Sequence, residues 1–356
     1  MPRPIRATIS RAAMAHNLGV ARQHAGEAKV WAVLKANAYG HGLLRAAQAF
    51  TAADGYAVLD FLEALKLRNA GIDKPILMLD GFFEPQDVAL LARHQLTPVI
   101  HSMEQVELLQ KSVLEGEIDA YLKVNSGMNR LGFNIDNLRV AWNALQDHRQ
   151  IRSVTLMTHL AEAESAAGAG PQIDWFNKMA QPFDAPRSLA NSAALLTLPQ
   201  ARAAWVRPGL MLYGCSPFAD RSAEALGLRP AMTLAAEIIA VQNLQPGERV
   251  GYGHTYEATA ETTIGVVACG YADGYPRHAP SGSPVLVAGQ RSRTVGRVSM
   301  DMLCVDISDI PDAYIGTPVT LWGEGLSADE VAAAAGTVSY QLLAGLAARV
   351  PIVEAP

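Results

Sequence analysis

Short apolar runs alternate with longer helical stretches through the first two-thirds of the chain, and this alternation constrains the fold more than any other feature. Such alternation is typical of parallel β/α units. The eight runs are Val30–Leu34, Tyr56–Leu59, Ile76–Leu79, Pro98–Ile100, Ala120–Val124, Val154–Met157, Ser188–Ala190 and Trp205–Val206. The helical stretches include Leu43–Phe50, Phe61–Ala70, Pro85–His94, Met103–Leu114 and Asn137–Gln146. Eight units predict an α/β fold with an N-terminal (β/α)8 barrel of the TIM type over residues 8–230.

A polar residue or a turn signal follows each apolar run. In chain order these residues are Lys35, Asp60, Asp80, His101, Asn125, His159, Asn191 with Ser192, and Arg207. Barrels of this type carry their active sites at the carboxyl ends of the strands. Any single strand can end on a polar residue because loops are hydrated. The complete ring, however, predicts an active site at this end of the barrel.

After about residue 230 the pattern changes to short β-rich segments separated by turn signals such as Gln245-Pro-Gly. These segments are Thr233–Val241, Val250–Tyr256, Thr263–Ala268, Val285–Val287, Thr294–Met300, Leu303–Ile307 and Val319–Trp322. Two helices, Ala328–Ala335 and Tyr340–Arg349, are expected to close the chain. We therefore predict a second, mostly β domain over residues 231–356, with the N-terminal residues 1–7 as candidates to join it.

Composition and charge exclude several classes of function. The 356 residues are half hydrophobic and carry a formal net charge of −5, with no block of Lys and Arg that would indicate nucleic-acid binding. No apolar run approaches the ~20 residues of a membrane span, and the N-terminus has no signal-peptide core. Cys215, Cys269 and Cys304 are odd in number and lack metal-ligand spacing. These observations predict buried free thiols, no metal site, no membrane partner and a cytoplasmic protein.

Lys35 follows five apolar residues and precedes a glycine-punctuated turn. Burial at the end of a strand disfavours the ammonium form and lowers the pKa of a lysine. A neutral amine is the form that condenses with an aldehyde, so Lys35 is a candidate Schiff-base lysine. On position alone, a lysine that extends from the strand end to water is the more common arrangement.

The string Lys35-Ala-Asn-Ala-Tyr-Gly-His-Gly42 closely resembles the lysine motif of alanine racemases, which bind pyridoxal 5'-phosphate (PLP). The resemblance continues along the whole chain and is closest to proteobacterial members. Further segments that resemble family motifs are Leu122–Gly132, Met157–His159, Leu189–Ser192, Val206–Gly214, Val250–Gly253, Gly270–Arg277, Gly296–Asp301 and Ser339–Leu343. The resemblance implies an isomerase that interconverts L- and D-alanine, and so supplies or consumes D-alanine for peptidoglycan.

The resemblance also implies a two-base mechanism, because racemisation removes the α-proton from one face and returns a proton to the other. Lys35 would carry PLP as a Schiff base and act on the D-enantiomer. Tyr252, supplied by the partner subunit of a homodimer with shared active sites, would act on the L-enantiomer. His159 paired with Arg207 resembles the relay that supports the tyrosine. Without its motif, Tyr252 would be interpreted as an ordinary packed tyrosine of the β domain.

Several further residues are implied to bind the cofactor. They are Tyr39, His159, Asn191, Ser192, Arg207, Gly209, Leu210 and Tyr340. Arg207 would face the pyridine nitrogen and donate a hydrogen bond without giving up a proton. A phosphate is expected at the loops after strands seven and eight, where Ser192, Gly209 and Leu210 lie. The general barrel rule and the resemblance therefore agree on this position.

The remaining implied residues concern the substrate. Arg130 and the Met300 N–H would contact the substrate carboxylate, and Lys123 matches a position at which many relatives carry a carbamylated lysine. The expected entrance corridor consists of Tyr271, Arg277, Arg297 and Asp301, with Tyr271 and Tyr252 at its narrowest point. Two residues depart from the family pattern: Glu164 replaces an Asp at a corridor position, and Ile352 replaces an Arg near the C-terminus.

Three alternatives remain at this stage. A broad-specificity racemase of the same fold would accept larger amino acids through a wider gate. A PLP-dependent decarboxylase has the same barrel, but the Tyr252 and Gly270–Arg277 motifs speak against it. A non-catalytic PLP-binding protein of this kind typically consists of the barrel alone, whereas this chain has a full second domain.

Overall fold

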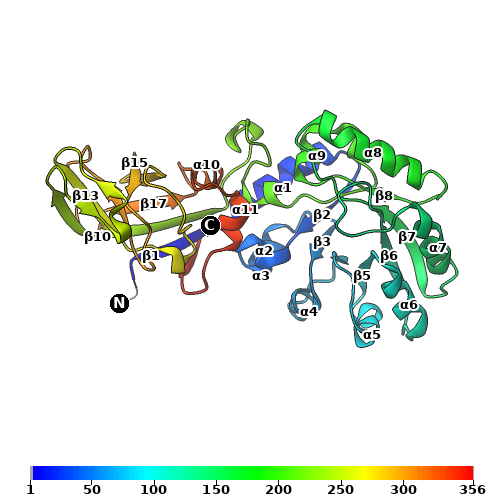
Figure 1. Cartoon of the computed structure of the whole chain (residues 1–356). Coiled ribbons are helices and arrows are strands. Elements are labelled where there is room, and N and C mark those ends of the chain that lie inside the picture. Colours follow the sequence, from blue (N-terminus) through cyan, green and yellow to red (C-terminus); the bar gives the residue numbers. More distant parts are fainter. Residues whose placement is uncertain (1–2, 356) are drawn as a thin grey trace.

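Eight parallel strands close into a barrel (Figure 1). The computed structural model describes residues 3–355 of the chain. The barrel strands are β2 (Lys29–Val33), β3 (Gly55–Val58), β4 (Ile76–Met78), β5 (Leu96–Ile100), β6 (Ile118–Lys123), β7 (Ile151–Met157), β8 (Arg187–Ser188) and β9 (Trp205–Val206). β9 pairs in parallel with β2 and closes the ring. The predicted eight-stranded barrel is therefore confirmed, including its two short final strands.

Helices cover the outside of the barrel. They are α1 (Arg11–Ala25), α3 (Leu43–Ala49), α4 (Phe61–Asn69), α5 (Pro85–Arg93), α6 (Met103–Lys111), α7 (Ile135–Gln146), α8 (Ala166–Ala180) and α9 (Ser192–Thr197). Most begin at a residue whose side-chain oxygen accepts a hydrogen bond from a backbone N–H of the first turn, which helix N-termini require. These N-cap residues are Ser10, Asp60, Ser102, Asn134, Ser165 and Asn191. Local capping chemistry thus fixes where the helices start.

Aromatic side chains fill part of the barrel interior. Trp31 of β2 stacks on Trp205 of β9 with ring centroids 4.2 Å apart. The indole N–H of Trp31 donates to the hydroxyl of Tyr121, a residue of β6, at 2.9 Å. Gly55 makes room for this indole, because a Cβ at that position would lie 2.2 Å from the Trp31 ring. The barrel is therefore a packed core, as in other barrels of this type.

The second part of the chain forms an eight-stranded sheet that also contains the N-terminal strand. Its strands are β1 (Ile5–Ser10), β10 (Met232–Leu244), β13 (Thr262–Val267), β14 (Pro284–Val287), β15 (Gln290–Val295), β16 (Leu303–Asp306), β17 (Pro318–Trp322) and β18 (Ile352–Ala355). β1 lies between β10, to which it is antiparallel, and β18, to which it is parallel. The N-terminal contribution to this sheet ends at Ser10, three residues beyond the predicted residues 1–7. Residues 1 and 2 lie outside the described part of the chain. The predicted division at residue 230 stays a prediction.

One predicted strand is interrupted, and two predicted elements end earlier than expected. The segment 250–256 is not one strand: β11 (Arg249–Val250) and β12 (Tyr256–Glu257) flank a 3₁₀ turn, because Gly251 and Gly253 both adopt a φ of 73°. The strand predicted to reach Met300 stops at Val295, since the following Gly296 has a φ of 74°. The final helix, α11 (Ser339–Ala344), stops at Gly345 rather than continuing to Arg349. Glycine conformations that other residues avoid explain the first two differences, and a glycine at the helix C-terminus accompanies the third.

A buried asparagine joins α1 to the connection between barrel and sheet. The Asn17 side chain donates to the carbonyls of Leu212 and Arg229 and accepts from the Arg229 N–H at 2.8 Å. Gly214 lies in the same connection, and a Cβ there would come within 1.9 Å of the Arg229 carbonyl oxygen. Figure 1 shows α10 (Ala328–Ala334) and α11 between the sheet and the barrel. One hydrophobic core extends through both parts of the molecule.

Within residues 3–355, none of the helices combines the length and apolar character needed to cross a bilayer. No cluster of three or more His, Cys, Asp or Glu side chains with the arrangement of a metal site occurs over the same range. Cys215 and Cys269 are buried free thiols as expected, whereas Cys304 is only half-buried. Burial raises the pKa of all three thiols, so they stay protonated at neutral pH.

Candidate active site

A cavity of about 150 Å³ lies at the carboxyl ends of the barrel strands and collects eleven of the predicted site residues. They are Lys35, Tyr39, Lys123, Arg130, His159, Asn191, Ser192, Arg207, Gly209, Leu210 and Tyr340. Ten of them come from the barrel segment, and Tyr340 comes from α11. Five further lining residues were not predicted as part of the site: Val33, Leu59, Leu79, Asp80 and Met157. Asp80 belongs to the predicted ring of polar strand ends, which is the signal that could have identified it.

The segment that carries Lys35 and Tyr39 is a left-handed turn. In α2 (Lys35–Tyr39), the four residues after the lysine have φ values of 52° to 56°. Residues with a Cβ avoid this conformation, at about 1–2 kcal/mol each, and such strain concentrates at functional sites. The Asn37 N–H donates to a carboxylate oxygen of Glu63 at 3.0 Å, and the Asn37 side chain accepts from the Leu43 N–H at 2.9 Å. These contacts hold the turn.

The environment of Lys35 favours its neutral form. Burial lowers the pKa of this lysine, and the positive charge of Arg130 lowers it further. Asp80 and Glu63 act in the opposite direction but are weaker influences. The pKa of Lys35 is thus shifted in the direction expected from its position at the end of a buried strand, which suits a nucleophilic amine.

The cavity has an excess of positive charge. Four basic side chains line it, those of Lys35, Lys123, Arg130 and Arg207, against the single carboxylate of Asp80 among the described lining residues. Burial, together with the charges of Arg207 and Arg130, lowers the pKa of Lys123 to about 8. Such a site favours ligands with several negative charges.

Arg207 is buried and fixed by backbone and hydroxyl oxygens. One terminal nitrogen donates to the Ser188 hydroxyl at 2.6 Å, and the other donates to the carbonyls of Thr158 and Leu189. Burial lowers the pKa of Arg207 to about 10, so it stays charged at neutral pH. Among the described residues, its Nε–H and one terminal N–H have no hydrogen-bond acceptor. These donors are available to a ligand in the cavity.

His159 lies in the same cavity as Arg207, but no hydrogen bond joins the two side chains in the described part of the chain. Burial and then the charge of Arg207 lower the pKa of His159 to about 3. The imidazole is therefore neutral at physiological pH and can accept a hydrogen bond. The two residues of the predicted pair therefore line the same cavity without a hydrogen bond between them in the described chain.

Backbone donors meet at the ends of β8 and β9. The Gly209 N–H donates to the Ser192 hydroxyl at 2.9 Å. The Leu210 N–H is the first of the 3₁₀ turn η2 (Leu210–Tyr213) and so lacks an acceptor within that turn. A Cβ on Gly209 would lie 2.5 Å from the Tyr39 hydroxyl, so glycine lets the backbone approach this hydroxyl closely. A hydroxyl, backbone N–H groups and a helix start together form a suitable anion site.

The other predicted site residues lie in the β domain and do not line this cavity. They are Tyr252, Tyr271, Arg277, Arg297, Met300 and Asp301. The side chain of Tyr252 is 72% exposed in the single chain. Arg277 lies over the Tyr271 ring at 6.0 Å, and Asp301 accepts from Arg349 at 2.7 Å. One chain therefore presents two separate halves of the predicted site.

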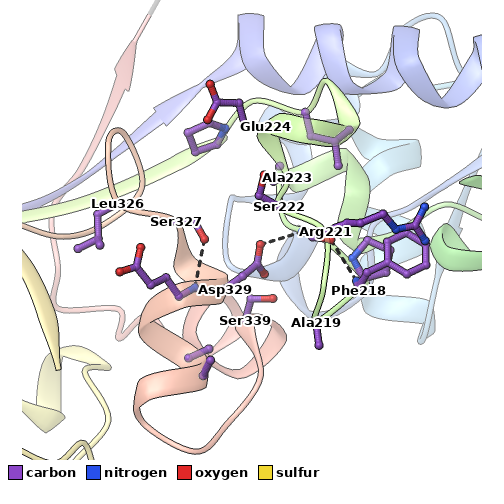
Figure 2. Close-up of a pocket in the computed structure, with 18 of the residues that line it drawn as sticks. Phe218, Ala219, Arg221, Ser222, Ala223, Glu224, Leu326, Ser327, Asp329 and Ser339 are labelled. Carbon is purple, nitrogen blue, oxygen red and sulfur yellow. Dashed lines mark hydrogen bonds between the residues drawn. The ribbon is translucent and has the colours of Figure 1, made fainter. Parts of the chain in front are cut away.

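A larger cavity of about 1080 Å³ lies between the connection after the barrel and the C-terminal helices. Figure 2 shows Asp329 and Ser339 on the helical side of this cavity and Phe218 and Arg221 on the connection. The Ser216 N–H donates to Asp329 at 2.8 Å and ties the two sides together. Tyr340 lines both cavities. Glu164, for which a position in the entrance corridor was predicted, is among the residues that line this larger cavity.

Two family descriptions match the chain. The description of the alanine racemase N-terminal domain matches residues 9–217, and that of the alanine racemase C-terminal domain matches residues 231–354. The chain belongs to the alanine racemase family. This family member is 52% identical to an alanine racemase of Nitrosomonas eutropha over 359 residues, which covers 99% of each chain.

It is also 51% identical to a catabolic alanine racemase of Klebsiella aerogenes over 354 residues, again covering 99% of each chain. The crystal structure of the biosynthetic alanine racemase from Pseudomonas aeruginosa superposes with a TM-score of 0.97 at 46% identity, covering 99% of this chain and 100% of that one. The predicted family and fold are confirmed. Relatives named catabolic and biosynthetic are thus both similar to this chain over almost its whole length.

Proposed function

We propose that this alanine racemase family member interconverts L- and D-alanine with PLP as cofactor, using Lys35 and the Tyr252 of a second subunit as the two bases. The observation that carries the proposal is the cavity itself. It places a lysine of lowered pKa beside an anion site, in surroundings with an excess of positive charge. A cofactor with an aldehyde, a phenolate and a phosphate matches those three features.

The residues present fit PLP. Lys35 would hold the aldehyde carbon covalently, while the Ser192 hydroxyl and the N–H groups of Gly209 and Leu210 would bind the phosphate. Tyr39 and Tyr340 would add hydroxyl donors, and burial raises the pKa of Tyr340 to about 12, so that its phenol keeps its proton. The unpaired N–H groups of Arg207 suit the ring nitrogen. His159 and Asn191 complete the lining around the ring.

When bound, PLP delocalises the electron pair that remains on the substrate α-carbon after proton removal. The protein must then supply one base on each face of that carbon. Burial lowers the pKa of Lys35, which increases the fraction of free amine that can accept a proton. Arg207 stays charged and would donate a hydrogen bond to the ring nitrogen without transferring a proton to it. Arg130 and the Met300 N–H would orient the substrate carboxylate.

A homodimer follows from where the second base lies. Tyr252 does not line the cavity of its own chain and is largely exposed. We therefore infer that two chains pair so that the β domain of each covers the barrel mouth of the other. In this arrangement, Tyr271, Arg277, Arg297 and Asp301 would line the route to the cavity. Bulky tyrosines on that route favour the methyl side chain of alanine.

Lys123 is a candidate for carbamylation. Its pKa of about 8 leaves a fraction of neutral amine at physiological pH, and the neighbouring Arg130 and Arg207 would stabilise an anion. In the reaction, the amine nitrogen attacks carbon dioxide, a C–N bond forms, and one proton is released to water. The carbamate would then be a negatively charged partner for Arg130. Among the described lining residues, the cavity otherwise has only one carboxylate, that of Asp80.

The alternative activities are less well supported. The full-length relatives are named as alanine racemases, so a broad-specificity racemase is not favoured. The chain also matches the family's C-terminal domain, which speaks against a barrel-only PLP-binding protein. Three free thiols are consistent with our proposal that the enzyme acts in the cytoplasm, and the activity would supply or consume D-alanine for peptidoglycan.

Isotope exchange tests the proposal. In heavy water, the wild-type protein with PLP should introduce deuterium at the α-carbon of both alanine enantiomers, while protein freed of PLP should not. Net racemisation must change equally in both directions in any variant, because the equilibrium constant is fixed. Exchange of each enantiomer therefore discriminates between the bases: Tyr252→Phe should keep exchange of D-alanine and lose that of L-alanine. Equal exchange of both enantiomers by this variant would contradict the two-base assignment.

A further inference from the structure

A histidine in the lysine motif has no role in the chemistry described above. His41 follows the left-handed turn by two residues and is completely buried. Its Nδ1 lies 2.9 Å from the Tyr39 carbonyl oxygen and 3.1 Å from that of Ala38. Because both neighbours are acceptors, the Nδ1 atom must carry the proton and donate. The ring is neutral, since burial lowers the pKa of His41 to about 4.

The other ring nitrogen of His41 has no partner. Its Nε2 is buried and makes no hydrogen bond within the described residues. A buried polar atom without a partner is unfavourable, so the hydrogen bonds of the other ring nitrogen, Nδ1, must hold the His41 ring in this position. The Ala38 carbonyl also accepts a hydrogen bond from the backbone N–H of His41 at 3.0 Å. The Tyr39 carbonyl, in contrast, has the Nδ1–H of His41 as its only donor in the described chain.

Aromatic stacking connects His41 to the cavity wall. The His41 and Tyr213 rings lie 4.7 Å apart, and Tyr213 stacks on Tyr39 at the same distance with an interplanar angle of 25°. The Tyr213 hydroxyl donates at 2.8 Å to the carbonyl of Val33, two residues before the turn begins at Lys35. The turn is thus held at its start by Tyr213 and at its end by His41. Lys35 and Tyr39, at its two ends, both line the cavity.

We propose that His41 is a positioning residue, whose Nδ1–H locks the left-handed turn and thereby aims the Lys35 amine and the Tyr39 hydroxyl at one bound cofactor. Residues with a Cβ do not keep four consecutive left-handed conformations without such support. If the turn relaxed toward right-handed geometry, Lys35 and Tyr39 would point in different directions. This inference rests on the proposed binding of PLP in the same cavity.

The test compares variants that keep different parts of the histidine. His41→Phe keeps a ring for stacking but removes the donor, whereas His41→Asn keeps a donor and removes the ring. We expect His41→Phe to weaken PLP binding to the apoprotein at least about tenfold, and to change the rate at which acetic anhydride labels Lys35 without cofactor. His41→Asn should recover a substantial part of both effects.

Tyr56→Phe is the matched control. Its buried hydroxyl also lies near two backbone carbonyls, those of Ala47 at 2.7 Å and Phe50 at 3.3 Å, but Tyr56 does not line the cavity. This variant should lose thermal stability while keeping the PLP dissociation constant and the Lys35 labelling rate. If His41→Phe behaved like Tyr56→Phe in both measurements, the role of His41 would be only structural and the proposal would be wrong.

A second measurement remains decisive if His41→Phe does not fold. The nitrogen NMR spectrum of wild-type protein labelled at histidine should show one ring protonated at Nδ1 and bare at Nε2 from pH 5.5 to 8. The opposite tautomer, or titration in that range, would overturn the proposal. A wild-type protein that binds no PLP at all would instead refute the proposed function, so the two failures are distinguishable.

Discussion

Replacing an alanine with glycine should raise the stability of the protein within the left-handed turn and lower it within a right-handed helix. Ala36 has an exposed methyl group and a φ of 56°. Replacing it with glycine relieves about 1–2 kcal/mol of backbone strain. Glycine also gains freedom in the unfolded chain, which costs about 0.5–1 kcal/mol. The net expectation is that Ala36→Gly stabilises the protein by about 0.5–1 kcal/mol.

Ala15 provides the matched control, because it is also exposed but lies inside the right-handed helix α1. There, glycine should destabilise the protein by about 1 kcal/mol. Scanning calorimetry of both variants at equal protein and PLP concentrations measures the difference. For a chain of this size, 1 kcal/mol corresponds to about 1–2 °C in the melting temperature. The melting temperature should rise for Ala36→Gly and fall for Ala15→Gly. A similar fall in both variants would refute the strain argument.

Further predictions concern the cavity and the dimer. Lys35→Ala should abolish covalent PLP binding and its absorbance band and slow racemisation at least about 10³-fold; retention of covalently bound PLP would contradict the role of Lys35. Tyr252→Phe should slow racemisation by about 10²–10⁴-fold with an unchanged PLP affinity, measured by titration. The pKa of unmodified Lys123 is about 8 in the folded chain, against 10.5 for an ordinary lysine in the unfolded chain. Between these two pH values the folded chain binds fewer protons than the unfolded chain, so the free energy of unfolding should rise with pH. Bicarbonate should raise the melting temperature of wild type but not of Lys123→Gln, and an equal rise in both would exclude carbamylation. Dilution that separates the subunits should abolish activity, and fully active monomers in sedimentation runs would contradict the shared site.

The barrel could be predicted because its strands are buried on both faces and therefore appear as short, continuous apolar runs. The cavity lining followed from the family motifs, and Lys35, Ser192 and Arg207 each lie within two residues of the end of a predicted strand. The left-handed turn could not be predicted in this way. Residues with a Cβ in this segment would ordinarily form a right-handed turn. The observed turn depends on His41 and also on contacts from Glu63 and Tyr213, which are distant in sequence.

The β domain was harder to predict in detail. The turn at Tyr252 interrupts a segment whose apolar pattern indicated a strand, because two glycines take left-handed conformations there. Asp80 was recognised as a strand end but not as the counter-charge to the cavity's cations, which depends on how the strands close around it. The proposed meeting of Tyr252 with Lys35 would involve two chains, and a contact between chains leaves no periodic pattern in the sequence of one.

The position of β1 between β10 and β18 determines the order in which this protein can be completed during synthesis. Ile5 pairs with Ala236 and Ala7 with Ile352, so β1 is synthesised well before the two strands that pair with it. The barrel strands, which end at Val206, have all emerged before those two strands and can close first. A translation product that stops short of Ile352 would leave one edge of β1 without its partner, open to pairing with another chain.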